Sequence, residues 1–179
     1  APLPRAGRSY YPEELSELMK YKGKTNADFT RLLLHCARAV SGFAQSDAPL
    51  TVLDPMCGKG TTLFCALEEG DHAVGMDVDA KALLEADQLL GRSLKMNRLK
   101  HKREESSLTV PKGKPVRSVG YRLSTSIEGW KNGDERTFRL LNGDLGVLPA
   151  VMARESFHLA VADLPYGVQH APSEGRKVM

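Results

Sequence analysis

The chain is poor in the residues that hold small proteins together without a large core. Its 179 residues include only three cysteines, Cys36, Cys57 and Cys65, an odd number at spacings that match neither a disulfide framework nor a zinc site. None of the five histidines lies at ligand spacing from a cysteine. We therefore expect reduced thiols and no bound metal.

Long apolar runs are also missing. No stretch approaches the ~18 apolar residues of a membrane span, and residues 1–12 carry three prolines without the apolar block of a signal peptide. We therefore expect no membrane partner and a cytoplasmic location. Apolar residues nevertheless make up 41% of the chain, which excludes a fully disordered protein and is sufficient for one domain with a core.

Two common phosphate-binding fingerprints are absent from the main glycine loop, D-P-M-C-G-K-G-T-T at residues 54–62. The loop is not G-x-x-x-x-G-K-[S/T], which disfavours a nucleoside triphosphate, and not G-x-G-x-x-G, which weakens a dinucleotide assignment. Gly58 and Gly60 still permit close approach of a ligand to the backbone. The helix expected after them presents free N–H groups, so the loop suits a carboxylate or a phosphate.

Hydrophobic periodicity predicts strands that alternate with helices. We expect strands over 50–54, 72–77, 138–142 and 157–162, and helices over 15–19, 25–42, 63–70, 80–90 and 148–152. Successive strands separated by a helix are joined by right-handed parallel crossovers. The fold class is therefore α/β, with a mostly parallel sheet flanked by helices.

Domain boundaries follow from the same pattern. Residues 1–48 form an N-terminal arm and helices, and residues 49–179 form the core domain. Residues from about 104 to 136 interrupt the alternation and form an insertion, for which a hairpin is one solution because 116–123 has strand composition. The segment G-W-K-N-G-D-E at 129–135 is turn-like in composition.

Each of the four strands finishes at or near an acid: Asp54, Asp77, Asp144 and Asp163. In doubly wound sheets the ligand lies beyond the carboxyl ends of the strands, which is where these acids fall. Each acid taken singly is readily explained as a helix N-cap or a turn former. As a set they indicate a binding site.

The acids and the loop together describe one ligand. Asp54 can accept a hydrogen bond from an ammonium, and Asp77 follows Gly58 at close to the ~20-residue offset at which an acid reaches ribose hydroxyls. Ammonium, carboxylate and ribose occur together in S-adenosylmethionine, whose adenine amine Asp144 could meet. The predicted cofactor-binding residues are Asp54, Pro55, Met56, Cys57, Gly58, Gly60, Thr61, Asp77, Val78, Asp144 and Asp163.

The segment D-L-P-Y-G after the fourth strand suits a second task. An exocyclic base amine is a poor nucleophile because its lone pair is delocalised into the ring. Asp163 and the Leu164 carbonyl can accept the two amine protons, Pro165 can stiffen the turn, and Tyr166 can stack on the base. A simple turn is the alternative interpretation of these four residues. Cys57 is disfavoured as a nucleophile because it lies inside the cofactor loop.

These motifs, in this order over residues 50–169, resemble the S-adenosylmethionine-dependent methyltransferases that modify an exocyclic amine of a nucleic-acid base. The likeness is greatest to the tRNA guanosine-N2 methyltransferase group related to THUMP-bearing enzymes. It implies a Rossmann-like fold, ribose held at Asp77, adenine at Asp144, and the target base held by 163–166, where Leu164 replaces the commoner first proline. It also implies further strands beyond this segment. We therefore expect the C-terminal strands to be missing, with a bare sheet edge that favours self-association or a partner subunit.

Positive charge is concentrated in residues 92–103, which hold six cations, one histidine and no acid. The candidate nucleic-acid contacts are Arg92, Lys95, Arg98, Lys100, Lys102 and Arg103. A solvated helix face is the alternative. Lys20–Asn26 is a second candidate contact, or else a basic linker.

The expected substrate is RNA, and tRNA in particular, because of the family resemblance rather than because of charge. Two alternatives stay open. One is a DNA adenine-N6 or cytosine-N4 methyltransferase, and the other is a catalytically inactive S-adenosylmethionine-binding partner subunit.

Overall fold

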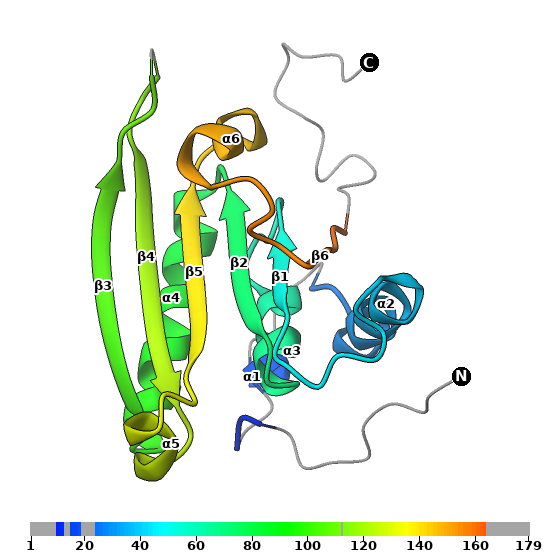
Figure 1. Cartoon of the computed structure of the whole chain (residues 1–179). Helices are drawn as coiled ribbons and strands as arrows, with labels where there is room; N and C mark the ends of the chain where they lie inside the picture. The colour runs from blue at the N-terminus through cyan, green and yellow to red at the C-terminus, as the bar shows by residue number, and fades with distance from the viewer. Residues whose placement is uncertain (1–9, 13–14, 19–23, 112, 164–179) are drawn as a thin grey trace.

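A computed structural model describes residues 10–12, 15–18, 24–111 and 113–163 (Figure 1). The helices are α1 (Leu15–Leu18), α2 (Ala27–Val40), α3 (Thr61–Glu68), α4 (Ala80–Met96), α5 (Ile127–Lys131), the 3-10 turn η1 (Leu145–Val147) and α6 (Leu148–Val151). The strands are β1 (Thr51–Asp54), β2 (His72–Asp77), β3 (Lys100–Leu108), β4 (Val116–Ser124), β5 (Arg136–Asn142) and β6 (Leu159–Ala160).

The strands form one sheet in the order β3-β4-β5-β2-β1-β6. Strands β5, β2, β1 and β6 are parallel to one another, whereas β4 is antiparallel to both β3 and β5. The expected α/β class is confirmed, but the sheet is mixed, because the insertion adds two strands to the parallel set. The chain places β2 and β5 on one side of β1 and β6 on the other. In open α/β sheets, ligands bind at the carboxyl ends of the strands where the order reverses in this way.

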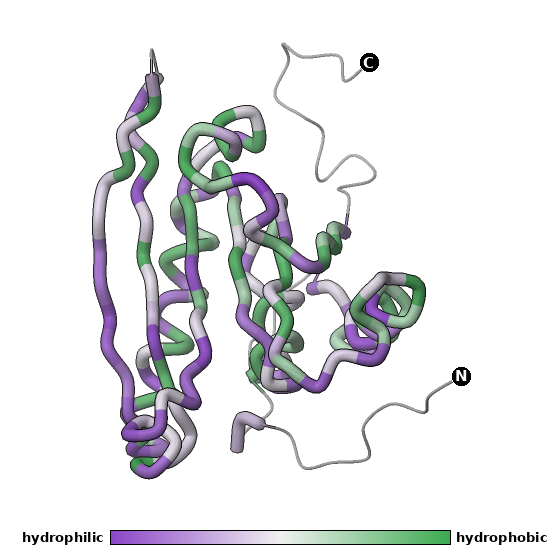
Figure 2. Tube along the Cα trace, in the orientation of Figure 1, coloured by the Kyte–Doolittle hydropathy of each residue, from purple (hydrophilic) through white to green (hydrophobic). Residues whose placement is uncertain are grey.

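The insertion is a hairpin, but it begins earlier than the sequence indicated. Strand β3 starts at Lys100, inside the basic run, and pairs with β4 from Lys100 opposite Ser124 to Leu108 opposite Val116. None of its residues is buried, so it lacks the alternation that reveals a strand in a sequence. Figure 2 shows β3 as a hydrophilic band at the sheet edge. Such a charged edge discourages pairing with a further chain.

Two smaller expectations were wrong in their extent. The turn-like segment 129–135 contributes Gly129, Trp130 and Lys131 to helix α5, whose first turn is capped by the Ser126 hydroxyl. The last strand, expected over 157–162, is assigned only to Leu159–Ala160. Backbone hydrogen bonds on either side of it still continue the ladder to β1, from His158 N to Thr51 O and from Val161 N to Leu53 O.

Helix starts follow the capping signals in the sequence. Asn26 accepts a hydrogen bond from Phe29 N at the start of α2, as predicted for residue 25 or 26. Asp79 accepts from Lys81 N and Ala82 N at the start of α4. These caps place the first turn of α4 directly after the end of β2.

The core lies mainly on one face of the sheet, against α1, α3 and α4, which stand behind the strands in Figure 1. Every residue of α3 is buried. Tyr11, Leu15 and Leu34 belong to the same apolar cluster as Val52 and Phe138, so the N-terminal helices share their core with the sheet. A smaller cluster on the opposite face packs α6 against β1, β2 and β5.

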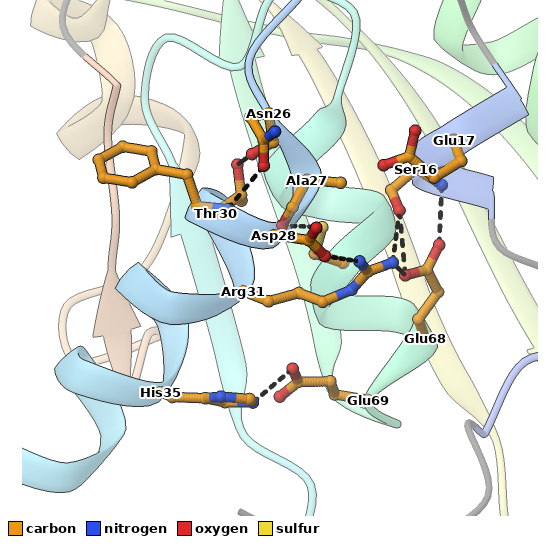
Figure 3. A network of polar contacts seen from close by, with 12 residues as sticks. Ser16, Glu17, Asn26, Ala27, Asp28, Thr30, Arg31, His35, Glu68 and Glu69 are labelled. Atoms are coloured by element: carbon orange, nitrogen blue, oxygen red, sulfur yellow. Dashed lines mark hydrogen bonds and ion pairs between the residues drawn. The ribbon is translucent and has the colours of Figure 1, made fainter.

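A buried polar network fastens α2 to α3 (Figure 3). Arg31 bonds Glu68 at 3.0 Å, and Glu68 also accepts hydrogen bonds from the backbone N–H and the hydroxyl of Ser16. Asp71 is similarly bound by Arg38 and by Leu50 N. Removing one partner of such a buried pair typically costs about 3–5 kcal/mol, so this network holds α1 and α2 against α3.

Within the described ranges, no helix is both long and apolar enough to cross a membrane. The three cysteines are free thiols.

Candidate functional site

The glycine loop is fastened to the end of β2 by Asp77. One carboxylate oxygen of Asp77 accepts from Gly58 N at 2.7 Å, and the other accepts from Asp79 N at 2.9 Å. A carboxylate offers about four acceptor sites, so both oxygens retain capacity for a ligand. Asp77 therefore shapes the loop and can still receive two hydroxyl protons.

Close packing beneath the loop depends on glycine in β2. A Cβ atom at Gly75 would lie 2.4 Å from Leu63 Cδ1 and 2.6 Å from Cys57 Sγ. Cys57 is buried, and burial raises the pKa of its thiol well above the ordinary value. The thiol thus stays protonated and fills space under the loop, which leaves it unsuited to nucleophilic attack.

Asp54 is the most unusual titratable group of this edge. Its side chain accepts hydrogen bonds from Met56 N and the Thr62 hydroxyl, and the residue is 2% exposed. Burial raises the Asp54 pKa to about 6, with a smaller contribution from the neighbouring carboxylates of Asp77 and Asp163 and against the lowering effect of the two hydrogen bonds. In the described part of the chain no lysine, arginine or histidine lies within ion-pair distance of Asp54. An added cation would therefore relieve an electrostatic cost.

Asp163 is held from an unexpected direction. The Thr25 hydroxyl donates a hydrogen bond of 2.8 Å to one of its carboxylate oxygens, across 138 positions of the chain. Thr25 belongs to the basic segment 20–26, whose residues 20–23 fall outside the described ranges, as do Leu164, Pro165 and Tyr166. The sequence offered no signal for this contact. It fixes the carboxylate beyond β6 from the start of α2.

Asp144 lies two residues beyond the end of β5 and is exposed. One of its carboxylate oxygens accepts from Gly146 N at 2.8 Å and caps η1. The capping role and a ligand role are compatible, because capping occupies only part of the acceptor capacity.

Asn142, which sequence reasoning did not select, joins two strand ends. Its side-chain amide donates to the carbonyls of Asp77 and Val78, at 3.0 and 3.2 Å. Gly143 N adds a hydrogen bond to the Asp77 carbonyl. Val78 and Leu145 follow the joined strands and are 70% and 47% exposed. This edge therefore offers two uncovered apolar side chains next to the carboxylates.

The residues present fit S-adenosylmethionine as a ligand. Asp54 is a desolvated carboxyl suited to an ammonium, Asp77 can receive ribose hydroxyls, and Val78 and Leu145 suit a flat apolar ring. Pro55 and Met56 form the turn, and Thr61 opens α3, whose first N–H groups suit a carboxylate. At Gly58 a Cβ atom would have no neighbour within 4 Å, so the loop faces open space there. Gly60 has a φ of 88°, a conformation that favours glycine.

The basic run is not part of this edge. Arg92 and Lys95 lie on the last turns of α4, Arg98 lies in the following turn, and Lys100, Lys102 and Arg103 lie at the start of β3. Helix α4 begins just after Asp77, so at 1.5 Å per residue its basic end is about 20 Å away. The predicted cofactor residues and the predicted nucleic-acid contacts thus form two separate regions.

Across the described ranges, no group of three or more His, Cys, Asp and Glu side chains is arranged to hold a metal ion. In comparisons with known proteins, no family model matches the chain and no curated protein matches it.

Proposed function

We propose that this protein is a Rossmann-like, cytoplasmic, S-adenosylmethionine-dependent methyltransferase that modifies an exocyclic base amine of RNA. Guanosine N2 in tRNA is the first substrate to test. The observation that carries the proposal is Asp54, a buried carboxyl with a raised pKa, no cationic partner in the described residues and two further carboxylates nearby. A cationic ligand is the simplest explanation for such an arrangement.

The chain's own residues divide the work of binding. Asp54 accepts from the ammonium, the start of α3 receives the carboxylate, and Asp77 accepts from the ribose hydroxyls while it holds Gly58. Asn142 keeps the ends of β2 and β5 together, so that Val78 and Asp144 keep their positions beside the ring. S-adenosylmethionine would supply an electrophilic methyl group on a sulfonium sulfur.

At the target base, Asp163 accepts a hydrogen bond from the amine and turns the nitrogen lone pair toward the methyl carbon. The nitrogen forms the new N–C bond, the electron pair of the broken C–S bond stays on sulfur, and one amine proton passes through Asp163 to water. Thr25 restrains Asp163 by its hydroxyl hydrogen bond. Orientation of this kind supplies part of the ~7–11 kcal/mol available from positioning.

The test is mass spectrometry of nucleosides after incubation of the protein with isotopically labelled S-adenosylmethionine and either unmodified tRNA transcripts or DNA. Labelled N2-methylguanosine is the expected product, and the Asp163→Ala variant should not form it. The control is Asp134→Asn, which removes an exposed acid at the far end of the sheet that pairs with Arg136. Labelled methyladenine or N4-methylcytosine in DNA alone would contradict the RNA assignment. Binding of the donor with no methylated product in either pool would favour the inactive partner subunit.

A further inference from the structure

A cleft lies between α4 and the β3–β4 hairpin, away from the carboxyl edge. This cleft has a volume of about 430 Å³, within the ~300–1,000 Å³ range of ligand pockets. It is lined by Asp87, Gln88, Gly91, Arg92, Lys95, His101, Arg103 and Tyr121. Four of these eight residues are basic or histidine, and one is acidic.

Strand alternation divides the basic run between the two faces of the sheet. His101 and Arg103 stand opposite Leu123 and Tyr121, which belong to the core beneath α4, so they point toward α4. Lys100 and Lys102 alternate with them and therefore point to the other face. Only part of the run can act at the cleft.

The acid in the cleft, Asp87, already has a counter-charge within the chain. Asp87 receives two hydrogen bonds from Arg103, at 3.1 and 2.8 Å, and one from the Tyr121 hydroxyl. Burial alone would raise the Asp87 pKa, but these hydrogen bonds lower it below the ordinary value. Arg103 is thereby committed within the chain, and it also pairs with Glu105.

The remaining cations have no such partner. Arg92 donates only a long hydrogen bond of 3.4 Å to Gln88, and neither Arg92 nor Lys95 forms an ion pair with any acid in the described ranges. His101 Nδ1 donates to the Leu99 carbonyl at 2.8 Å, which leaves Nε2 for a ligand. In the neutral ring with Nδ1 protonated, Nε2 is a hydrogen-bond acceptor.

We propose that this cleft binds the RNA backbone, with Arg92 and Lys95 on a phosphate and His101 Nε2 accepting from a ribose 2′-hydroxyl. The inference rests on the proposed RNA substrate and adds an anchoring site about 20 Å from the reaction edge. Phosphate contacts would supply affinity, and the acceptor on His101 would distinguish RNA from DNA, because only RNA offers the hydroxyl proton. Lys100 and Lys102 contribute little by this account.

The test is fluorescence anisotropy of labelled unmodified tRNA transcript and of DNA of the same sequence, across a range of salt concentrations. The double variant Arg92→Gln/Lys95→Gln should lose about tenfold or more in affinity for both nucleic acids, with a shallower salt dependence. His101→Phe should weaken binding of RNA severalfold and leave binding of DNA unchanged. The matched control is Arg139→Gln, because Arg139 is an exposed cation on β5 whose side chain, by alternation with Phe138, faces away from α4.

Equal losses for Arg139→Gln and the double variant would contradict the cleft and indicate nonspecific charge. If Lys100→Gln/Lys102→Gln lowers the affinity for RNA and Arg92→Gln/Lys95→Gln does not, the RNA contact lies on the face of the sheet opposite α4. Circular dichroism and calorimetric binding of S-adenosylmethionine by each variant show whether it is folded. If the cleft variants bind RNA normally while labelled methyl transfer to RNA persists, the cleft assignment fails and the proposed function stands. If the cleft variants lose RNA binding as expected but the unaltered chain transfers no methyl group, the cleft assignment stands and the proposed function fails.

Discussion

Asp54 and Asp87 are two aspartates of nearly equal burial, 2% and 6% exposed, with opposite electrostatics. Asp87 is bound by Arg103 and Tyr121, and its pKa lies below the ordinary value. Among the described residues, Asp54 receives hydrogen bonds from neutral donors alone, and its pKa is raised to about 6. A buried acid that pairs with a cation of its own chain is a structural ion pair. A buried acid without such a cation indicates that a bound ligand supplies the counter-charge.

The same contrast separates the two regions in which these residues lie. The carboxyl edge gathers acids and offers Asp54 no cation among the described residues, whereas the cleft pairs its acid with Arg103 and leaves Arg92 and Lys95 without an acidic partner in the described ranges. One region suits a cation and the other suits an anion. Helix α4 joins them, with its first turn at the former and its last turns at the latter.

Removing the satisfied acid should have the largest effect on stability. Asp87→Ala leaves Arg103 and Tyr121 without their buried acceptor, so we expect the free energy of unfolding to fall by about 3 kcal/mol. Urea denaturation at pH 7.5 measures this change. A loss below about 0.5 kcal/mol would show that Asp87 is not the structural member of the pair.

Removing the charge of Asp54 should raise the free energy of unfolding instead of lowering it. Asp54→Asn keeps an acceptor for Met56 N and removes a desolvated charge, so we expect a gain of about 2 kcal/mol in unfolding free energy at pH 7.5. The same variant should lose at least tenfold in affinity for S-adenosylmethionine. Urea denaturation and calorimetry of one preparation measure both, and a loss of stability would contradict the contrast with Asp87.

The pH dependence sharpens the comparison further. Because the folded pKa of Asp54 is raised, the folded protein holds a proton that the unfolded chain releases, and this contribution to stability is lost as pH rises from about 4 to about 6. Asp87 behaves in the reverse sense, and its contribution is lost as pH falls below its unfolded value. The difference in unfolding free energy between the unaltered chain and Asp54→Asn should therefore change most between pH 4 and 6. A difference that does not vary with pH would contradict the raised pKa of Asp54.

The smallest expected effect concerns Thr25, a positioning residue for Asp163. Thr25→Val removes the hydroxyl donor at nearly constant volume and should cost about 1 kcal/mol of stability. If the proposed function holds, kcat for methyl transfer should fall about tenfold with KM for RNA unchanged, and Thr25→Ser should restore it. Equal kinetics for Val and Ser variants would show that Thr25 does not act through Asp163.

The sequence predicted those parts of the fold that carry local signals. A few neighbouring residues are enough to recognise the capping residue Asn26, the glycine loop and the apolar strands that end at Asp54 and Asp77. Strand β3 does not, because an edge strand with both faces exposed has no apolar period. The sequence therefore predicted one contact surface over residues 92–103, although strand alternation places His101 and Arg103 on one face of the sheet and Lys100 and Lys102 on the other.

The site was predictable where it follows from strand ends and unpredictable where it depends on distant contacts. The convergence of Asp54 and Asp77 follows from the parallel pairing of β1 with β2. The bonds from Thr25 to Asp163 and from Asn142 to Asp77 join residues 138 and 65 positions apart, and no local pattern around Thr25 or Asn142 indicates its partner. The pairing of Asp87 with Arg103 likewise depends on the register of β3.

The most direct test of the central claim is calorimetric titration of the folded chain with S-adenosylmethionine at pH 7.5 and at pH 5. We expect one site whose affinity falls about tenfold at the lower pH, as Asp54 takes up a proton, with little such change in Asp54→Asn. Absence of binding by protein that unfolds cooperatively, or binding of equal strength at both pH values, would contradict the account.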